Sequence, residues 1–130
     1  MKIIYKIWLE SESGRAFGKG PCRLLRGIQE TGSLRKAASA MGLTYKKARL
    51  VIASCERSLG FALTRRKIGG AKGGGSEVTN DAVELMKKHE AVRAEAENAL
   101  AEAYTKHFGQ PAEAQFYTVL SRRGGGKAME

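Results

Sequence analysis

The sequence has few cysteines and prolines, and it lacks a long run of apolar residues. Its 130 residues include only two prolines and two cysteines, Cys22 and Cys55. The cysteines have no metal-ligand spacing and fall on apolar helix faces. We therefore expect buried free thiols in a cytoplasmic protein, with a disulfide or redox pair as the alternative. No run of about 18 or more apolar residues occurs, so we expect no membrane span, and the alternating start does not resemble a signal peptide.

Residue patterns for catalysis and nucleotide binding are also missing. His89 and His107 fall on one predicted helix, far from any acid–nucleophile set, and Ser54 and Cys55 lack a nucleophile elbow. The glycines of residues 69–75 match neither a Walker loop nor the pattern Gly-x-Gly-x-x-Gly. We therefore expect no enzyme activity: no catalytic residues, no metal site and no cofactor.

Positive charge, in contrast, is abundant and unevenly placed. The net charge is +10. Residues 1–76 hold sixteen Lys and Arg against four acids, a net +12, whereas residues 77–130 hold seven against nine, a net −2. This segregation favours a polyanionic partner for the first part of the chain. The alternative is that the basic surface only aids solubility.

Periodicity and capping residues predict an ordered series of elements. In chain order they are a strand at 2–10, a loop at 11–20, a helix from Gly20-Pro21 to Thr31, helices at 34–41 and from Thr44 to Leu59, strands at 62–68 and 77–78, and a long helix at 79–108 capped by Thr79.

The predicted fold class is mainly α with a small β component: a winged helix-turn-helix domain plus a long C-terminal dimerisation helix. We expect residues 1–78 to form the winged helix-turn-helix domain with its N-terminal strand, and residues 79–108 to form the dimerisation helix. Residues 109–130 form a short helical segment, at 112–120, and a disordered tail from residue 121.

The segment from Ser33 to Ile52 has all the sequence features that a helix-turn-helix motif requires. Ala38 supplies the small residue midway along the first helix, and Gly42, four residues on, suits the left-handed turn. Apolar residues flank the glycine and line the inner face of the second helix: Met41, Leu43, Ala48 and Val51. The alternative is an ordinary helical corner within a core.

Polar and basic residues at the start of the second helix are the candidate DNA contacts. The N-terminal part of a recognition helix enters the major groove, where Lys and Arg bind guanine edges or phosphates. The candidates on this helix are Thr44, Tyr45, Lys46, Lys47 and Arg49. Tyr45 could bind a phosphate or stack on a sugar or thymine methyl, whereas Thr44 could be only a helix cap.

Two further groups of residues are candidate backbone contacts. On the first helix they are Ser33, which could be only a cap, and Arg35 and Lys36, which could be only solvated. In the wing they are Arg65, Arg66, Lys67 and Lys72. The five glycines at 69–75 would let the wing approach phosphates or the minor groove, although a disordered linker is the alternative.

The long helix carries an apolar stripe that predicts pairing of two chains. Leu85, Val92 and Ala99 recur every seven residues, with Ala96 and Ala103 one turn further on, and these five residues are the candidate dimer interface. A helix of this length is unusual within a single domain. The alternative is that it packs only on its own domain.

The stretch from residue 20 to residue 85 resembles the N-terminal DNA-binding domain of ModE, the molybdate-responsive repressor, which is itself similar to the LysR-type winged helix. The matching motifs are ETGSLRKAASAMGLTYKKA at 30–48 and GGAKGGGSEVT at 69–79. The resemblance implies a DNA-contacting wing and a long pairing helix. It departs at Arg49, where the family usually has an aromatic residue. No segment resembles the molybdate-binding domains, so we expect no molybdate sensing by this chain.

We therefore predict a sequence-specific transcriptional regulator that binds double-stranded DNA as a homodimer, on an imperfect palindrome. A non-specific architectural DNA-binding protein is one alternative, and a steep salt dependence with little sequence preference would identify it. A regulator whose effector is sensed by a partner protein is the other.

Overall fold

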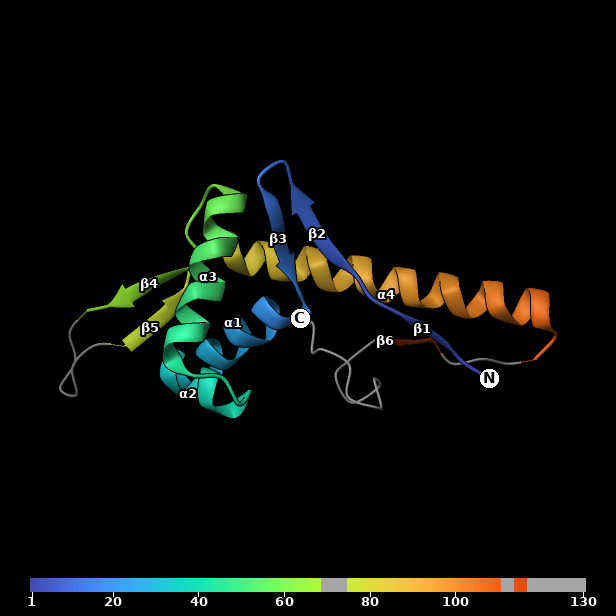
Figure 1. Cartoon of the computed structure of the whole chain (residues 1–130), viewed down its shortest axis with the longest axis horizontal. Helices are drawn as coiled ribbons and strands as arrows, with labels where there is room; N and C mark the ends of the chain where they lie inside the picture. The colour runs from blue at the N-terminus through green and yellow to red at the C-terminus, as the bar shows by residue number, and fades with distance from the viewer. Residues whose placement is uncertain (69–74, 111–113, 117–130) are drawn as a thin grey trace. The chain divides into compact units, whose positions relative to one another are not determined.

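The computed structural model describes residues 1–68, 75–110 and 114–116. Figure 1 shows a mainly helical chain with small sheets, as the sequence predicts. The elements, in order, are β1 (Ile3–Tyr5), β2 (Trp8–Ser11), β3 (Gly14–Gly18), α1 (Lys19–Thr31), α2 (Leu34–Ala40), α3 (Tyr45–Leu59), β4 (Thr64–Lys67), β5 (Gly75–Val78), α4 (Asn80–Phe108) and β6 (Ala114–Phe116).

The chain packs as two units. The larger is Trp8–Lys87, and the other combines Met1–Ile7 with Lys88–Glu130, so α4 contributes to both. The larger unit holds the core. Its largest fully buried side chains come from β3, α1 and the segment before β4: Phe17, Leu24, Leu25, Ile28 and Leu63.

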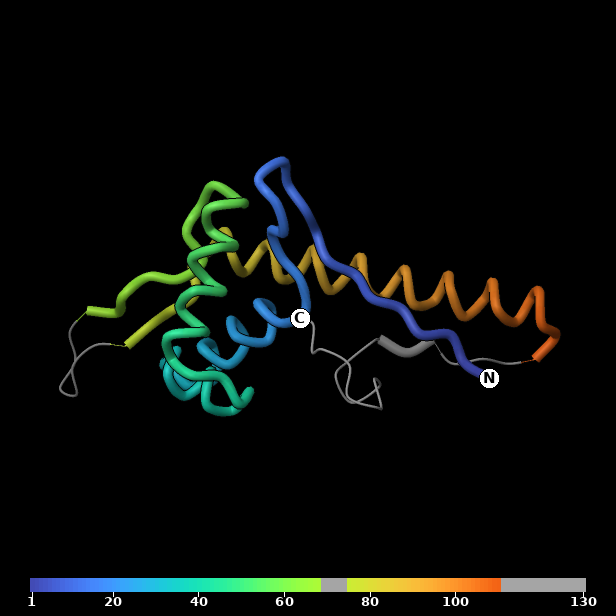
Figure 2. The backbone as a smooth tube through the Cα atoms, viewed as in Figure 1, coloured from blue at the N-terminus to red at the C-terminus, as the bar shows by residue number. Residues whose placement is uncertain are grey.

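The start of the chain differs from the single strand and loop that the sequence predicts. The strand at 2–10 is interrupted at Lys6 and Ile7, giving β1 and β2. The expected loop at 11–20 contains β3, which pairs antiparallel with β2 and sets Leu9 opposite Phe17. The prediction was wrong here because residues 11–20 are mostly small and polar, which is typical of a loop. The strand β3 forms because β2 supplies its hydrogen-bonding partner. Figure 2 traces this hairpin.

The three helices of the larger unit are confirmed with small shifts at their ends. Helix α1 begins at Lys19, so Pro21 is its third residue and not its first, and it ends before Gly32 as expected. Ser33 caps α2, its hydroxyl accepting a hydrogen bond from the Lys36 amide at 3.0 Å. Gly42 lies in the turn between α2 and α3 with φ of 71°, a left-handed conformation that glycine adopts without steric cost.

Helices α1 and α2 cross closely at Gly27. A Cβ atom added there would lie 2.7 Å from the Cβ of Ala37. Gly27→Ala is expected to lower the free energy of unfolding by about 1–3 kcal/mol, because overpacking strains the helix contact. Urea denaturation measures this. The swapped variant Gly27→Ala/Ala37→Gly removes the methyl group of Ala37 and should recover most of the lost free energy of unfolding. If the swapped variant were no more stable than Gly27→Ala, a clash between these two side chains would not be the cause of the loss.

The hairpin β4–β5 follows α3 as expected, although its first strand is shorter than the predicted 62–68 and its second begins at Gly75 and not at Glu77. Thr64 lies opposite Val78 and Lys67 opposite Gly75. Thr79 joins it to α4: its hydroxyl donates to the Ala62 carbonyl at 2.8 Å and accepts from the Ala82 amide at 3.1 Å. This confirms Thr79 as the helix cap. From α3, the Glu56 carboxylate accepts from the Leu63 amide at 2.7 Å. The base of the hairpin is therefore held by both neighbouring helices.

The expected helical turn at 112–120 is wrong for the part that the structure describes. Residues Ala114–Phe116 form β6, which pairs in parallel with β1. A strand forms because β1 offers hydrogen-bonding groups that local periodicity does not reveal. The rest of that segment and the predicted tail from residue 121 lie outside the described residues. Among the described residues, no helix is long and apolar enough to cross a membrane.

Both cysteines are buried free thiols, as predicted. Burial raises the pKa of the Cys55 thiol from 9.0 to about 11, with a smaller contribution from Glu56. Because the thiol is held neutral in the folded state, its contribution to stability is complete below pH 9 and is lost as the pH rises towards 11. The melting-temperature difference between the wild type and Cys55→Ala should narrow over this range. A constant difference would contradict the shifted pKa.

Candidate nucleic-acid interface

The start of α3 presents the basic residues that the sequence singles out. Thr44 caps the helix, its hydroxyl accepting from the Lys47 amide at 3.0 Å. Ala48, Ile52 and Cys55 face the core. Helical spacing places Lys46 on the opposite face, with Lys47 and Arg49 on its two flanks. All three side chains are exposed, so this end of α3 is free to contact a ligand.

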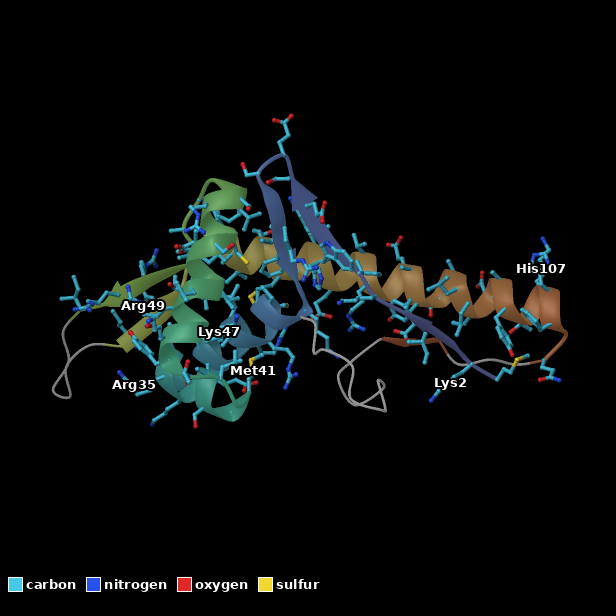
Figure 3. The ribbon with its side chains drawn as sticks, in the orientation of Figure 1. Lys2, Arg35, Met41, Lys47, Arg49 and His107 are labelled. Carbon is cyan, nitrogen blue, oxygen red and sulfur yellow. The ribbon has the colours of Figure 1, made fainter. Side chains whose placement is uncertain are left out.

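Tyr45 brings the two helices of this region together. Its ring lies under the Arg35 guanidinium of α2, with 4.2 Å from Cζ to the ring centroid. The Cζ of Arg49 lies 5.9 Å from the same centroid. Figure 3 shows Arg35 and Arg49 on the same side of the helix pair, with Lys47 apart from them. The fold therefore gathers two guanidinium groups, from different helices, around one aromatic ring.

The other predicted contacts of α2 lie beside this cluster in sequence. Ser33 acts as the N-cap, so the capping role that the sequence suggested is confirmed. Lys36 is exposed, as is Arg35. Among the residues that the structure describes, no carboxylate forms an ion pair with Arg35, Lys36 or Arg49. Their charge is therefore available to an external anion.

The basic residues of the hairpin differ in whether an acidic side chain pairs with them. Arg65 forms an ion pair with Glu77 across the strands, with 2.6 Å between Nε and Oε2. This hydrogen bond and charge hold the pKa of Glu77 below its usual value. Arg66 and Lys67 are exposed and have no such partner within the described part of the chain. Lys72 lies outside the described residues.

The hairpin is anchored beside the start of α2. The Ser76 amide donates a hydrogen bond to the Gly32 carbonyl at 2.9 Å. At Gly75 an added Cβ would lie 2.6 Å from the same oxygen, so only glycine permits this approach. The contact fixes β5 next to the residue before the Ser33 cap. Basic residues of α2, α3 and the hairpin thus belong to one packed unit.

The predicted dimer residues of α4 differ in exposure. Leu85 is partly buried and packs against the core of its own unit. Val92 is 52% exposed. Ala99 and Ala103 are exposed and Ala96 is partly buried. Beyond Leu85, much of the stripe is therefore open to solvent within the single chain.

Elsewhere on α4, the two histidines have different environments. His107 is exposed and His89 is buried, which lowers the pKa of its imidazole; nearby Glu90 opposes this shift and Arg93 adds to it. In the same unit, burial raises the pKa of the Tyr5 hydroxyl, which lies near Arg93 and Glu97. These groups belong to the packing of the smaller unit and lie outside the basic cluster of α2 and α3.

Two residues of the outward face of α3 were missed by the sequence analysis. Leu50 is 57% exposed, although leucine is normally assigned to a core. Arg57 is exposed in the last turn of α3. Helical spacing places both on the face of Lys46, opposite the core, so this spacing was the signal that could have identified them.

The geometry defines a mainly helical unit with a basic, exposed helix start and an anchored basic hairpin. The chain is similar to two curated proteins named molybdenum transport protein ModE. It is 41% identical to the protein of Herbaspirillum seropedicae over 63 residues, which are 48% of this chain and 23% of that protein. It is 28% identical to the protein of Azotobacter vinelandii over 99 residues, 76% of this chain and 37% of that one. The aligned regions thus cover less than two fifths of either relative.

No protein-family model matches the chain.

Proposed function

We propose that this chain is a ModE-like, sequence-specific DNA-binding transcription regulator of the cytoplasm, in which Trp8–Lys87 forms a winged helix-turn-helix. The observation that carries the proposal is the exposed basic cluster at the start of α3, next to Arg35 of α2. In this proposal α3 is the recognition helix, and its first turns enter the major groove. The assignment includes no catalytic role.

Each basic element has a separate part in this arrangement. Lys46 and Arg49, at the exposed start of α3, contact base edges. Residues at the start of α2 contact phosphates, because the first helix of such a pair crosses the backbone. Arg66 and Lys67 of the hairpin contact the neighbouring backbone, and the hydrogen bond from Ser76 to Gly32 sets their position relative to α2.

The proposed regulator acts as a homodimer through α4. This helix has 29 residues, and the exposed stripe of Val92, Ala99 and Ala103 has the seven- and four-residue spacing of a helix-pairing face. Two recognition helices related by a two-fold axis contact half-sites about 34–36 Å apart. The binding site is therefore an imperfect palindrome.

Selection of duplexes from a random pool tests the function directly. We expect a palindromic consensus with half-sites about one helical turn apart, and analytical ultracentrifugation should give a dimer. Enrichment of no sequence above bulk DNA would overturn sequence-specific regulation and favour an architectural role. The selection is run with and without molybdate; a molybdate-dependent change in binding would contradict the expectation that this chain does not sense it.

The Arg65–Glu77 ion pair gives a prediction of increased affinity. Glu77→Gln removes a negative charge and releases Arg65 for a phosphate, so DNA binding should strengthen. The slope of log K against log salt should steepen by about one. Fluorescence anisotropy over a salt series measures both. Glu12→Gln is the matched control, because it removes one negative charge from an exposed position in the turn before β3. An equal gain in affinity in both variants would show that the effect comes from net charge alone.

A further inference from the structure

We propose that Tyr45 is a positioning residue: its ring holds the Arg35 guanidinium in place for a DNA backbone phosphate, without itself contacting the DNA. The inference rests on the proposed DNA-binding function and deepens it. A tyrosine at the start of a recognition helix would ordinarily be assigned a contact of its own. In the structure, however, the face of the Tyr45 ring is covered by the Arg35 guanidinium.

The geometry of the stack carries the argument. The Arg35 Cζ lies 4.2 Å from the ring centroid, well within the range of about 6 Å for a cation–π interaction. A guanidinium lying on a ring keeps its N–H edges free for bidentate phosphate binding. Arg49, at 5.9 Å, lies at the limit of that range and one helical turn from Tyr45. The ring therefore orders Arg35 more strongly than Arg49.

Arg35 needs such support because of where it is placed. It is exposed on α2, and no carboxylate among the described residues fixes its side chain. A long side chain that is free in solution loses rotamer freedom when it binds. A guanidinium already held on Tyr45 has lost part of that freedom before DNA arrives. The neighbouring Lys36, also exposed, contacts no aromatic ring in the described part of the chain and serves as the internal comparison.

Variants of Tyr45 separate the ring from its hydroxyl. Tyr45→Phe and Tyr45→Trp keep an aromatic face and should bind the selected duplex within about twofold of the wild type. Tyr45→Leu keeps an apolar side chain without a π face and should bind about two- to fivefold more weakly. If Tyr45→Phe weakened binding as much as Tyr45→Leu, the hydroxyl would be the contact and the inference would be overturned.

A double-mutant cycle tests the route through Arg35. In the Arg35→Ala background, Tyr45→Leu should cause no further loss, whereas in the matched Lys36→Ala background its full effect should remain. An unchanged effect of Tyr45→Leu in the Arg35→Ala background would overturn the inference. Thermal melting of each variant confirms that it is folded before its affinity is compared.

A measurement on the free chain distinguishes this inference from the proposed function. Ring-current shifts of the Arg35 side-chain protons in NMR spectra should be present in the wild type and lost in Tyr45→Leu. Their absence in the wild type would overturn the positioning role even if the chain binds DNA. Failure of the wild type to bind any duplex would overturn the proposed function, and with it the role of the stack in DNA binding.

Discussion

Phe17→Ala is expected to lower the free energy of unfolding by about 3–5 kcal/mol, the cost typical of removing a buried phenyl ring. Phe17 has no exposed surface and belongs to the core of the larger unit. Its strand, β3, packs against both α1 and α3. Truncation therefore leaves a cavity beneath α3, one of the two helices that carry the basic cluster. Because small domains are stable by only about 5–15 kcal/mol, this one change should remove a large part of the stability.

Chemical denaturation monitored by circular dichroism measures the effect of Phe17→Ala. Phe108→Ala is the matched control, because Phe108 is 58% exposed and its ring stacks on Tyr104. We expect the control to lose much less stability. Equal losses of stability in the two variants would contradict the placement of Phe17 in the core.

Lys46→Ala/Arg49→Ala is expected to abolish sequence preference while leaving weaker, general DNA binding. Each base contact that is lost should cost about 1–3 kcal/mol, or about fivefold to 150-fold in affinity, for the selected site alone. The remaining attraction comes from phosphate contacts by Arg66, Lys67 and residues of α2. Competition between selected and random duplexes in gel-shift titrations measures the specificity ratio.

Arg66→Ala/Lys67→Ala is the matched control for this change, since it also removes two exposed basic residues. It should weaken binding to every duplex alike and reduce the slope of log K against log salt by about two. Lys72→Ala should act in the same direction. If all of these variants weakened selected and random duplexes equally, the architectural alternative would replace the sequence-specific one.

Much of the helical part of the fold could be predicted from the sequence because its signals are local. Ser33 and Thr44 cap α2 and α3 as expected, and Gly42 adopts the left-handed turn. A cap or a turn depends on a residue and its neighbours within one helical turn. The apolar spacing of α3 likewise determined which face would be buried and left the basic residues outside.

The strands and the pairing of charges could not be predicted in the same way. β3 exists because β2 supplies its partner, and β6 exists because β1 does. The exposed sequence of Arg65, Arg66 and Lys67 suggested three equal contacts, yet Glu77 on the opposite strand engages Arg65. Such partners are set by strand register, which short and polar segments specify weakly.

By itself, the sequence determined the helices, their caps, the turn at Gly42 and the segregation of positive charge, since each depends on neighbouring residues or on composition. Only the tertiary structure decided that Phe17 is core, that the hairpin docks on Gly32, and that Tyr45 carries Arg35. Those three features join residues that lie far apart along the chain or on different elements. Their contacts form only when the chain packs, so no local pattern could encode them.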